Sequence, residues 1–357
     1  MRTHGNQSKS FGPVATIGID TGKNTFHLIG LDARGAIVLQ IKLSRSQLER
    51  RLANIPRCLV GMEACSGSHH LARQIQKLGH DMRLIPAQYV KPFLKGHKND
   101  YRDAEAIAEA VQRPTMDFVA IKTPEQMDLL ALHRVRSRLV GQRTGVINQI
   151  RRGFLIERGI TVRQGVAPLR KALPDILSSN PEALSPRMVR LILDLADDWR
   201  RLDVRIETVS AEIGALAEQD GSCQRLMTVP GVGPIISSAV VAAIGNGGGF
   251  RQGRDFGAWL GLVPRQNSTG DRTKLGKISK RGNKYLRTLF VQAAHVVLVR
   301  RPAAAERGLW PWIEAASERL AHRNLVAIAL ANKLARIAWA VLARGRSYEP
   351  RVTSHAT

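Results

Sequence analysis

The stretch VATIGIDTGKNTFHLIGLDARGAIVLQIKL, residues 14–43, decides the fold of the first part of the chain. Apolar and β-branched residues gather in three short runs, Val14–Asp20, Thr25–Leu31 and Ala36–Leu43, and this composition is typical of strands. A Thr-Gly-Lys turn separates the first two runs, and Asp32–Gly35 separates the second from the third. Because connections this short join antiparallel neighbours, the stretch predicts a three-stranded antiparallel meander.

Helices and strands alternate in the residues that follow the meander. Ser44 is predicted to cap a short basic helix. The later elements are predicted in the order strand, helix, strand, helix, at Arg57–Glu63, Gly67–Leu78, Asp81–Ile85 and from Asp100 onward. Such alternation implies a parallel part of the sheet, so the predicted fold class is α/β with a mixed sheet. A meander that feeds such units is similar to the order of the ribonuclease-H-like fold, found in many polynucleotidyl transferases.

Four carboxylates from three distant segments are predicted to meet at one edge of this sheet. Asp20 ends the first, central strand, and Glu63 ends the fourth, which pairs beside it. Sites in open α/β sheets lie at such strand ends. The other two belong to KGHKNDYRDAEAIAEA, residues 95–110. There Asp100 is predicted to be the N-cap of a helix, and Asp103 lies on the same face of the first turn.

A cluster of four carboxylates is stable around divalent cations, and hard oxygen ligands predict Mg²⁺ or Mn²⁺. Two such ions would clamp the attacking and leaving oxygens of a phosphodiester. Each acid also has an ordinary explanation: an Asx turn for Asp20, an arginine ion pair for Glu63, and helix capping with a favourable dipole interaction for Asp100 and Asp103. For all four together, the metal centre is the favoured interpretation. Three histidines near these acids, His69, His70 and His97, show no repeated metal-binding spacing.

The composition favours an intracellular nucleic-acid-binding protein. Of the 357 residues, 54 are Lys or Arg and 29 are acidic, a net charge of +25 that indicates a polyanionic partner. The hydrophobic share of 44% predicts folded domains. The three cysteines form no CxxC pair, and no apolar signal segment begins the chain, so we expect a cytoplasmic protein with reduced thiols. No membrane span is predicted, because the most apolar late stretch, Leu325–Leu342, is interrupted by Asn332, Lys333 and Arg336.

The middle of the chain predicts two long helices. Thr123-Pro124 opens a basic helix that runs roughly to Glu157, and Ser185-Pro186 opens a second one. The apolar residues of the second helix alternate spacings of four and three, at Leu195, Trp199, Leu202, Ile206, Val209, Ile213 and Leu216. This heptad pattern predicts an antiparallel helical hairpin, a dimer-forming coiled coil, or both.

Two motifs mark the last part of the chain. VPGVG at 229–233 is typical of a helix-hairpin-helix, in which Gly231 and Gly233 would let backbone N–H groups approach a phosphate; a plain helix–helix turn is the alternative. Ser268 follows in a predicted polar loop, where basic side chains would hold a scissile phosphate. These are Arg265, Arg272, Lys274, Lys277, Lys280, Arg281, Lys284 and Arg287. Since no base is adjacent, the pattern alone favours a turn serine or a phosphate contact over a nucleophile.

Seven motifs in fixed order cover nearly the whole chain. They are IGID at 17–20, GMEA at 61–64, KGHKNDYRDAEAIAEA at 95–110, VPGVG at 229–233, GLVPRQNSTG at 261–270, KISKRGNKYLR at 277–287 and ALANKLARIAWAVLARGRSY at 329–348. With these motifs the chain resembles the insertion-sequence 110 family of transposases, in its 1111 subgroup. The resemblance implies a RuvC-like domain whose four magnesium-binding carboxylates are Asp20, Glu63, Asp100 and Asp103.

The same resemblance implies a C-terminal transposase domain with a catalytic serine, at Ser268. Family members have one or two serines before the glycine, and here the second position is Thr269. Members are recombinases guided by a structured non-coding RNA of their own element, and they act as oligomers. Their composite sites bring the RuvC-like centre of one subunit to the serine domain of another, which would supply the activation that Ser268 lacks in its own sequence surroundings.

These observations together predict an insertion-sequence transposase that cuts and rejoins DNA through Ser268, with a divalent metal at the four carboxylates. A RuvC-like junction endonuclease that uses water is the alternative enzyme, and the intact carboxylates speak against an inactive nucleic-acid scaffold. The expected domains are a RuvC-like domain at 1–122, a helical coiled-coil region at 123–220 for dimerisation and nucleic-acid binding, and a mostly α-helical transposase domain at 221–357. The expected partners are DNA, guide RNA and further copies of the chain, in the prokaryotic cytoplasm near the nucleoid.

Overall fold

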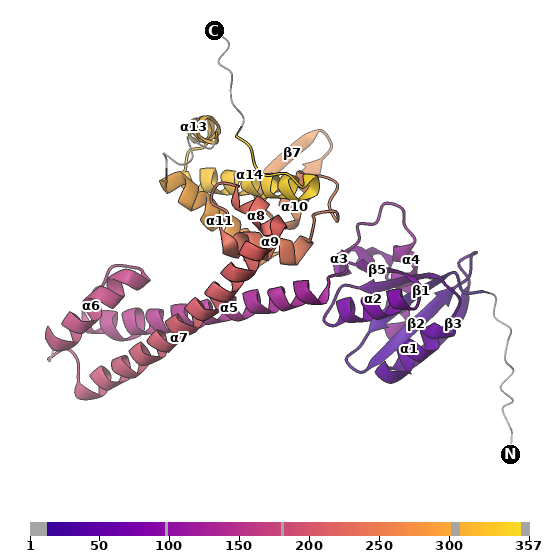
Figure 1. Ribbon diagram of the computed structural model, residues 1–357, viewed down its shortest axis with the longest axis horizontal. Helices are drawn as coiled ribbons and strands as arrows, with labels where there is room; N and C mark the ends of the chain where they lie inside the picture. Colours follow the sequence, from indigo (N-terminus) through magenta and orange to yellow (C-terminus); the bar gives the residue numbers. More distant parts are fainter. Residues whose placement is uncertain (1–12, 97–98, 180–181, 301–307, 351–357) are drawn as a thin grey trace, which may run out of the picture. The chain divides into compact units, whose positions relative to one another are not determined.

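The computed structural model describes residues 13–96, 99–179, 182–300 and 308–350. His97, in the predicted basic loop, lies outside the described residues. The chain divides into two compact units, Met1–Thr123 and Pro124–Thr357 (Figure 1). Apart from Thr123, the predicted regions 123–220 and 221–357 therefore fall in the second unit, and the division between them stays a prediction.

A five-stranded mixed sheet forms the centre of the first unit. Its strands are β1 Thr16–Thr21, β2 Thr25–Leu31, β3 Ile37–Ser44, β4 Leu59–Glu63 and β5 Asp81–Ile85. Their order is β3-β2-β1-β4-β5, with β1 antiparallel to β2 and parallel to β4. This confirms the predicted mixed sheet, with the meander on one side and the parallel strands on the other.

Helices cover both faces of this sheet. On one face, α1 Arg45–Ala53 and α2 Ser68–Lys77 pack onto the apolar side chains of β1, β2 and β4. The other face is covered by α4, Asp100–Val111, which buries Ala104 and Ala108 against β2. The short α3, Ala87–Val90, and the 3₁₀ turn η1, Lys91–Phe93, join β5 to the segment before α4. Because the side chains of a strand alternate between the two faces, each strand contributes residues to both of these packed layers.

The start of α4 differs from the prediction by one residue. Asn99, not Asp100, is the N-cap, and its side-chain oxygen accepts from the backbone N–H of Tyr101 at 2.9 Å. Asn and Asp are equally good caps, and the asparagine occupies the extended position before the first turn. Asp100 is thus the first helical residue, which leaves its carboxylate available near the positive end of the helix dipole.

The second unit begins with two long helices that run antiparallel. They are α5, Pro124–Asn148, and α7, Pro186–Gln219. Helical structure continues after α5 as a π turn and a 3₁₀ turn to Arg158, close to the predicted end, and α6, Val166–Ser179, lies between the two long helices in sequence. Arg143 donates to Asp203 at 3.0 Å and Arg136 to Ser210 at 2.8 Å. Since residue numbers rise along α5 as they fall along α7, these contacts establish the antiparallel direction.

Part of the predicted heptad seam of α7 is covered within the chain. Trp199, Ile206 and Ile213, spaced by seven, are buried, whereas Leu216 is 42% exposed. The helices packed against α7 include α5 and α9, Pro234–Ile244, and Trp199 shares a core with Leu169 and Leu173 of α6. Packing within the chain therefore accounts for the buried side of the seam.

The rest of the second unit is mostly helical, as predicted, with one long apolar helix in its core. The remaining helices are α8 Gly221–Met227, α10 Gly253–Trp259, α11 Lys284–Val299, α13 Trp310–Arg319 and α14 Arg323–Arg344. Within the described residues, α14 is the one helix long and apolar enough to cross a membrane by length and composition. Its side chains Leu330, Leu334 and Ala338 are fully buried in the core with residues of α9 and α11, so packing accounts for its apolar character.

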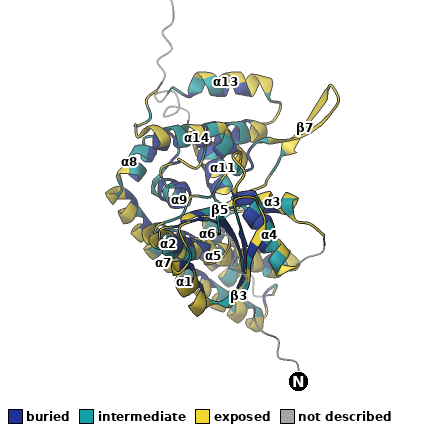
Figure 2. Cartoon of the chain, turned by 90° about the vertical axis from the view of Figure 1, so that its right-hand side faces the viewer, coloured by how far each residue is buried: buried dark blue, intermediate teal, exposed yellow. Residues whose placement is uncertain are grey.

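Ser268 lies in a β-hairpin, not in the predicted polar loop. The strands are β6, Pro264–Thr269, and β7, Arg272–Ile278, and nearly every residue of the hairpin is exposed (Figure 2). Gly270, with φ of +54°, occupies the turn between them. The polar composition of the segment predicted a loop because a two-stranded ribbon with both faces in solvent lacks the apolar alternation of a packed strand.

Candidate active site

Two glycines let α4 approach the sheet closely enough to bring the predicted carboxylates together. Alternation along β1 places Gly18 and Asp20 on the face that α4 covers, and Gly61 and Glu63 occupy the same face of β4. A Cβ atom on Gly18 would lie 2.0 Å from the Ala104 carbonyl oxygen, and one on Gly61 would lie 2.8 Å from Val111 Cβ. The middle of α4 therefore packs closely on β1, and its last residue packs on β4.

The four predicted carboxylates are near enough to affect one another electrostatically. Partial burial raises the pKa of Asp20 above its ordinary value, and the charges of Asp103 and Asp100 raise it further. Burial likewise raises the pKa of Glu63, to which the charges of Asp20 and Asp103 add. The Lys91 ammonium has the opposite effect on the pKa of Glu63. Asp20, Glu63, Asp100 and Asp103 thus form one acidic cluster, which we call the tetrad.

His27 also belongs to this cluster, and the sequence interpretation missed it. In the β1–β2 ladder it is the direct partner of Asp20. Its Nδ1 lies 3.4 Å from Asp100 Oδ2, and its ring packs edge-on against the ring of Tyr101, with centroids 4.8 Å apart. One ligand atom from each of Asp20, His27 and Asp100 lies within 4.8 Å of the other two. The meander register was the signal in the sequence, because a tight turn after Thr21 pairs Asp20 with His27.

The tetrad fits a divalent cation. Burial is the main reason why the pKa values of Asp20 and Glu63 are raised, and the repulsion between neighbouring carboxylates adds to it. A bound cation would remove this repulsion. The donor set is mainly carboxylate oxygen, which suits Mg²⁺ or Mn²⁺. Asp20, Glu63 and Asp103 are half-buried and Asp100 is exposed, so the site is open to a substrate.

Ser268 belongs to the second unit, on one defined face of the β6–β7 hairpin. Gln266 Nε2 donates to Ser268 Oγ at 2.8 Å, and Thr273, its cross-strand partner, lies 3.3 Å away through its hydroxyl. Neither partner is a base. With Leu275 opposite Gln266, these residues form a neutral face.

The basic residues near the hairpin tip occupy the opposite face. Arg272 pairs with Thr269, and Lys274 pairs with Asn267. Since adjacent residues of a strand point to opposite sides, these two cations point away from the serine face. The two faces of the ribbon therefore present different chemistry: a serine with neutral partners on one side, and positive charge on the other.

The other predicted nucleic-acid contacts fall into two groups. Exposed basic residues of the hairpin and the following segment are Arg265, Lys277, Lys280, Arg281 and Lys284. In contrast, Arg287 is half-buried and donates to the carbonyl oxygens of Leu260 and Arg281, at 2.8 and 3.2 Å. Its guanidinium therefore stabilises the turn before α11.

The predicted helix-hairpin-helix glycines differ in their surroundings. Gly231, with φ of +77°, lies against α11, where an added Cβ would be 2.9 Å from the Ala293 carbonyl oxygen. Close packing thus accounts for this glycine. Gly233 is the N-cap of α9, and nothing lies within 4 Å of the Cβ position, so close packing does not account for this glycine.

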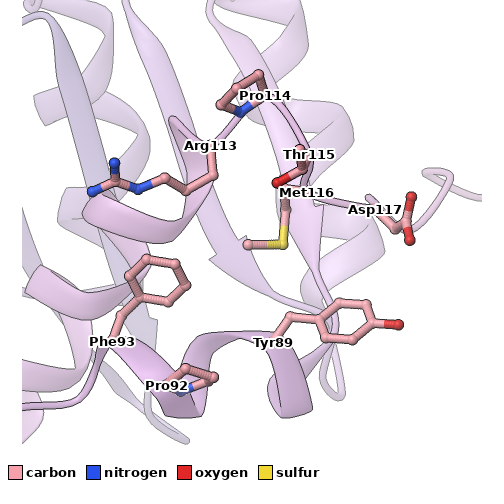
Figure 3. A pocket seen from close by; sticks show the side chains of 8 residues that line it. All are labelled: Tyr89, Pro92, Phe93, Arg113, Pro114, Thr115, Met116 and Asp117. Carbon is pink, nitrogen blue, oxygen red and sulfur yellow. The ribbon is translucent and has the colours of Figure 1, made fainter. Parts of the chain in front are cut away.

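A separate pocket of about 440 Å³ lies in the first unit, around η1 and the end of α4 (Figure 3). It is lined by Tyr89, Pro92, Phe93, Arg113, Pro114, Thr115, Met116 and Asp117. None of these is a predicted site residue. The Arg113 guanidinium lies over the Phe93 ring, 5.7 Å from its centroid, and also pairs with Glu109 at 2.8 Å. The concavity and the tetrad are therefore distinct features of the same unit.

Two family models match the chain. A family model described as "Transposase IS116/IS110/IS902 family" matches residues 223–308, and a second model, for DEDD transposases of the IS110 type, matches residues 17–155. The chain is 44% identical over 338 residues to a probable family 20 transposase of Pseudomonas aeruginosa, which covers 94% of this chain and 99% of that protein.

Two named insertion-sequence proteins are similar over comparable lengths. The transposase for IS1328 of Yersinia enterocolitica is 45% identical, across 93% of this chain and 98% of that protein. The transposase for IS1111A of Coxiella burnetii is 39% identical, across 95% and 93%. Each similarity spans both structural units.

Proposed function

The chain belongs to the IS116/IS110/IS902 family of transposases, enzymes that cut and join DNA, and we propose that it does so with the Ser268 hydroxyl as nucleophile and with a divalent ion at the tetrad. The convergence of the four carboxylates from β1, β4 and α4 is the observation that carries this proposal. Burial and, after it, the charges of neighbouring carboxylates raise the pKa of Asp20 and Glu63, and a cluster of this kind gains most from a bound cation.

In the proposed reaction, Ser268 Oγ attacks the scissile phosphorus. An Oγ–P bond forms, and the serine proton passes to a base. The P–O bond to the leaving DNA oxygen breaks, and that oxygen takes up a proton and leaves as a hydroxyl. The phosphoserine ester keeps the bond energy, so a free DNA hydroxyl can later attack it and restore the serine. Bound at Asp20, Glu63, Asp100 and Asp103, a divalent ion would supply charge stabilisation at phosphate oxygens and a lowered pKa of an attacking hydroxyl.

The proposal assigns the tetrad and the serine to different copies of the chain in a homo-oligomer. The hydrogen-bond partners of Ser268 in its own hairpin are Gln266 and Thr273, and neither accepts a proton readily. A carboxylate from another subunit would meet that need. The exposed part of the α7 heptad seam, which includes Leu216, supports a dimer-forming role for residues 123–220.

Nucleic-acid binding follows from the charge of the chain, +25. We propose that DNA or a guide RNA contacts the exposed cations Arg265, Lys274, Lys277, Lys280, Arg281 and Lys284, with Arg287 supporting their turn. In this assignment Gly233 offers backbone N–H groups to a phosphate in a helix-hairpin-helix arrangement, and Gly231 shapes the turn. Residues 1–122 then act as the RuvC-like domain and residues 221–357 as the serine domain, in the cytoplasm.

A water-using junction endonuclease is the second candidate, and one observation favours it. The Ser268 hydroxyl is already engaged by two neutral side chains, as expected for a serine that shapes a turn or contacts a phosphate. In that case the tetrad would act on water and no covalent link to DNA would form.

A covalent-trapping experiment separates the two candidates. Purified protein, the RNA of its element, Mg²⁺ and labelled element-end DNA are mixed and run on a denaturing gel. We expect a labelled band at the combined mass of protein and DNA, absent in Ser268→Ala and in Asp20→Ala. The matched control is Thr269→Ala, which removes the neighbouring hydroxyl on the other face of β6. Cleaved DNA without an adduct, undiminished in Ser268→Ala, would establish the endonuclease instead.

A further inference from the structure

We propose that His27 is a nitrogen ligand of the divalent ion held by Asp20 and Asp100, and that this ligand gives the centre a preference for Mn²⁺ over Mg²⁺. The inference rests on the proposed function in one respect, namely that the tetrad holds an ion. It adds a fifth residue, outside the four carboxylates, and a chemical selectivity that the carboxylates alone would not provide.

The spacing of His27 and Asp100 suits two ligands of one ion better than a hydrogen bond. Their closest atoms, Nδ1 and Oδ2, are 3.4 Å apart. A charge-assisted N–H···O bond is shorter, about 2.7–2.9 Å. Two ligand atoms that each lie about 2.1 Å from a metal are about 3.0–3.5 Å apart in octahedral or tetrahedral geometry. The observed distance falls in that range.

The third donor comes from the strand register. Asp20 and His27 are directly opposed on β1 and β2, and both project from the face of the sheet that α4 covers. Their ligand atoms and that of Asp100 lie within 4.8 Å of one another. Three donors from three elements therefore surround one point, and small side-chain rotations suffice to bring them onto a common ion.

The imidazole is held in place before any ion binds. His27 is 7% exposed, and the Tyr101 ring packs against it at 79°. Tyr101 immediately follows Asp100, so the same first turn of α4 supplies both the carboxylate that faces the histidine and the ring that fixes its orientation. A ligand whose rotamer is locked by packing loses little entropy on binding.

The mixed donor set determines the selectivity. Mg²⁺ prefers oxygen ligands and near-ideal octahedral geometry. Imidazole nitrogen suits transition metals. At a given nitrogen–oxygen site, the affinities of divalent transition metals follow the Irving–Williams order. Mn²⁺ accepts both carboxylate and imidazole, so the addition of the His27 nitrogen to the carboxylate oxygens favours Mn²⁺ relative to Mg²⁺.

Pulsed electron paramagnetic resonance on the full chain loaded with Mn²⁺ tests the ligand directly, without any measurement of activity. We expect the echo modulation of a directly coordinated ¹⁴N nucleus in the wild-type protein. The modulation should vanish in His27→Gln, and it should persist in the control His70→Gln, which changes an exposed histidine of α2.

Calorimetric titration of the same proteins supplies the second readout. His27→Gln should weaken Mn²⁺ binding by roughly 10- to 100-fold, a range typical of losing a group that supports a metal site, and Mg²⁺ binding by clearly less. Mn²⁺ binding that depends on Asp20 but lacks ¹⁴N modulation in the wild type would overturn the assignment of His27 and leave the proposed metal centre intact. Mn²⁺ binding that is indifferent to Asp20→Asn would overturn the proposed centre itself.

Discussion

Substitution of Gly18 by alanine tests the close packing that assembles the tetrad. The added Cβ would lie 2.0 Å from the Ala104 carbonyl oxygen and 2.5 Å from the Ala108 amide nitrogen. Both are backbone atoms of α4, so no side-chain rotation relieves the overlap. Because Cβ atoms are essentially never found closer than 3.0 Å to other heavy atoms, α4 must retreat by at least about 1 Å.

The energetic cost follows from that displacement. Overpacking of a well-packed core typically costs about 1–3 kcal/mol, and contact with two rigid backbone atoms places Gly18→Ala at about 3 kcal/mol. At Gly61 the nearest atoms belong to the Val111 side chain, at 2.8 Å and beyond. A side chain yields more easily, so Gly61→Ala should cost about 1 kcal/mol. In the control Gly141→Ala nothing lies within 4 Å, and a helical glycine replaced by alanine should stabilise by roughly 0.5–1 kcal/mol.

The assay must report on the first unit. All five tryptophans lie between Trp199 and Trp339, so their fluorescence follows the second unit. Urea unfolding by circular dichroism, with hydrogen exchange of peptides from α4, monitors the first unit as well. Gly18→Ala should accelerate exchange in α4 and weaken Mn²⁺ binding, because Asp100 and Asp103 move away from the sheet. A Gly18→Ala protein within about 0.5 kcal/mol of wild type, with unchanged α4 exchange, would refute the packing described here.

Three further predictions concern charge. First, the raised folded-state pKa of Asp20 makes its contribution to stability greatest below the unfolded pKa, and that contribution is lost as pH rises through the folded value. At neutral pH Asp20 is charged, and under mildly acidic conditions it becomes protonated. Metal-free protein should therefore melt at a lower temperature at neutral pH than under mildly acidic conditions. Asp20→Asn should raise the neutral-pH melting temperature, by about 2–4 °C for each kcal/mol regained; equal melting temperatures of the two proteins would contradict the repulsion. Second, Arg272→Ala with Lys274→Ala should weaken DNA binding and reduce its logarithmic salt slope by about 1–2, whereas Ser268→Ala should change neither; filter binding at several salt concentrations decides, and an unchanged slope in the double variant would show that this face does not contact phosphates. Third, Asp203→Ala removes the carboxylate shared by two arginines of the helical hairpin and should cost about 1–3 kcal/mol, measured by urea unfolding with tryptophan fluorescence; a loss below about 0.5 kcal/mol would mean that solvent screens these pairs.

Sequence patterns predicted the sheet because its determinants are local. The three runs of residues 14–43 have strand composition and turns too short for any crossover, so the meander follows. Alternation of helices and strands then requires the parallel addition of β4. With Asp20 and Glu63 at neighbouring strand ends, their proximity was a consequence of topology and needed no knowledge of side-chain packing.

Some features could not be predicted from the sequence. They depend either on a choice between two residues of similar preference or on contacts between distant segments. Asn99 and Asp100 are both good N-caps, and sequence alone does not decide which one occupies the extended position. His27 could not be identified as part of the site from the sequence, because the carboxylate that faces it, Asp100, lies on the distant helix α4. Likewise, Ser268 lies on a strand because cross-strand hydrogen bonds form the ribbon, while its polar composition carries no strand periodicity.

The β6–β7 hairpin is exposed to contacts with other molecules, whereas the helical core of the second unit keeps the protein folded. Nearly all side chains of the hairpin lie in solvent (Figure 2), and substitutions at such positions usually change stability by less than about 0.5 kcal/mol. Mutations can therefore accumulate along the ribbon, altering its charge and its reach, while the helical core beneath it stays intact. In mobile elements that encounter new DNA, selection can therefore change the hairpin with almost no loss of folding stability.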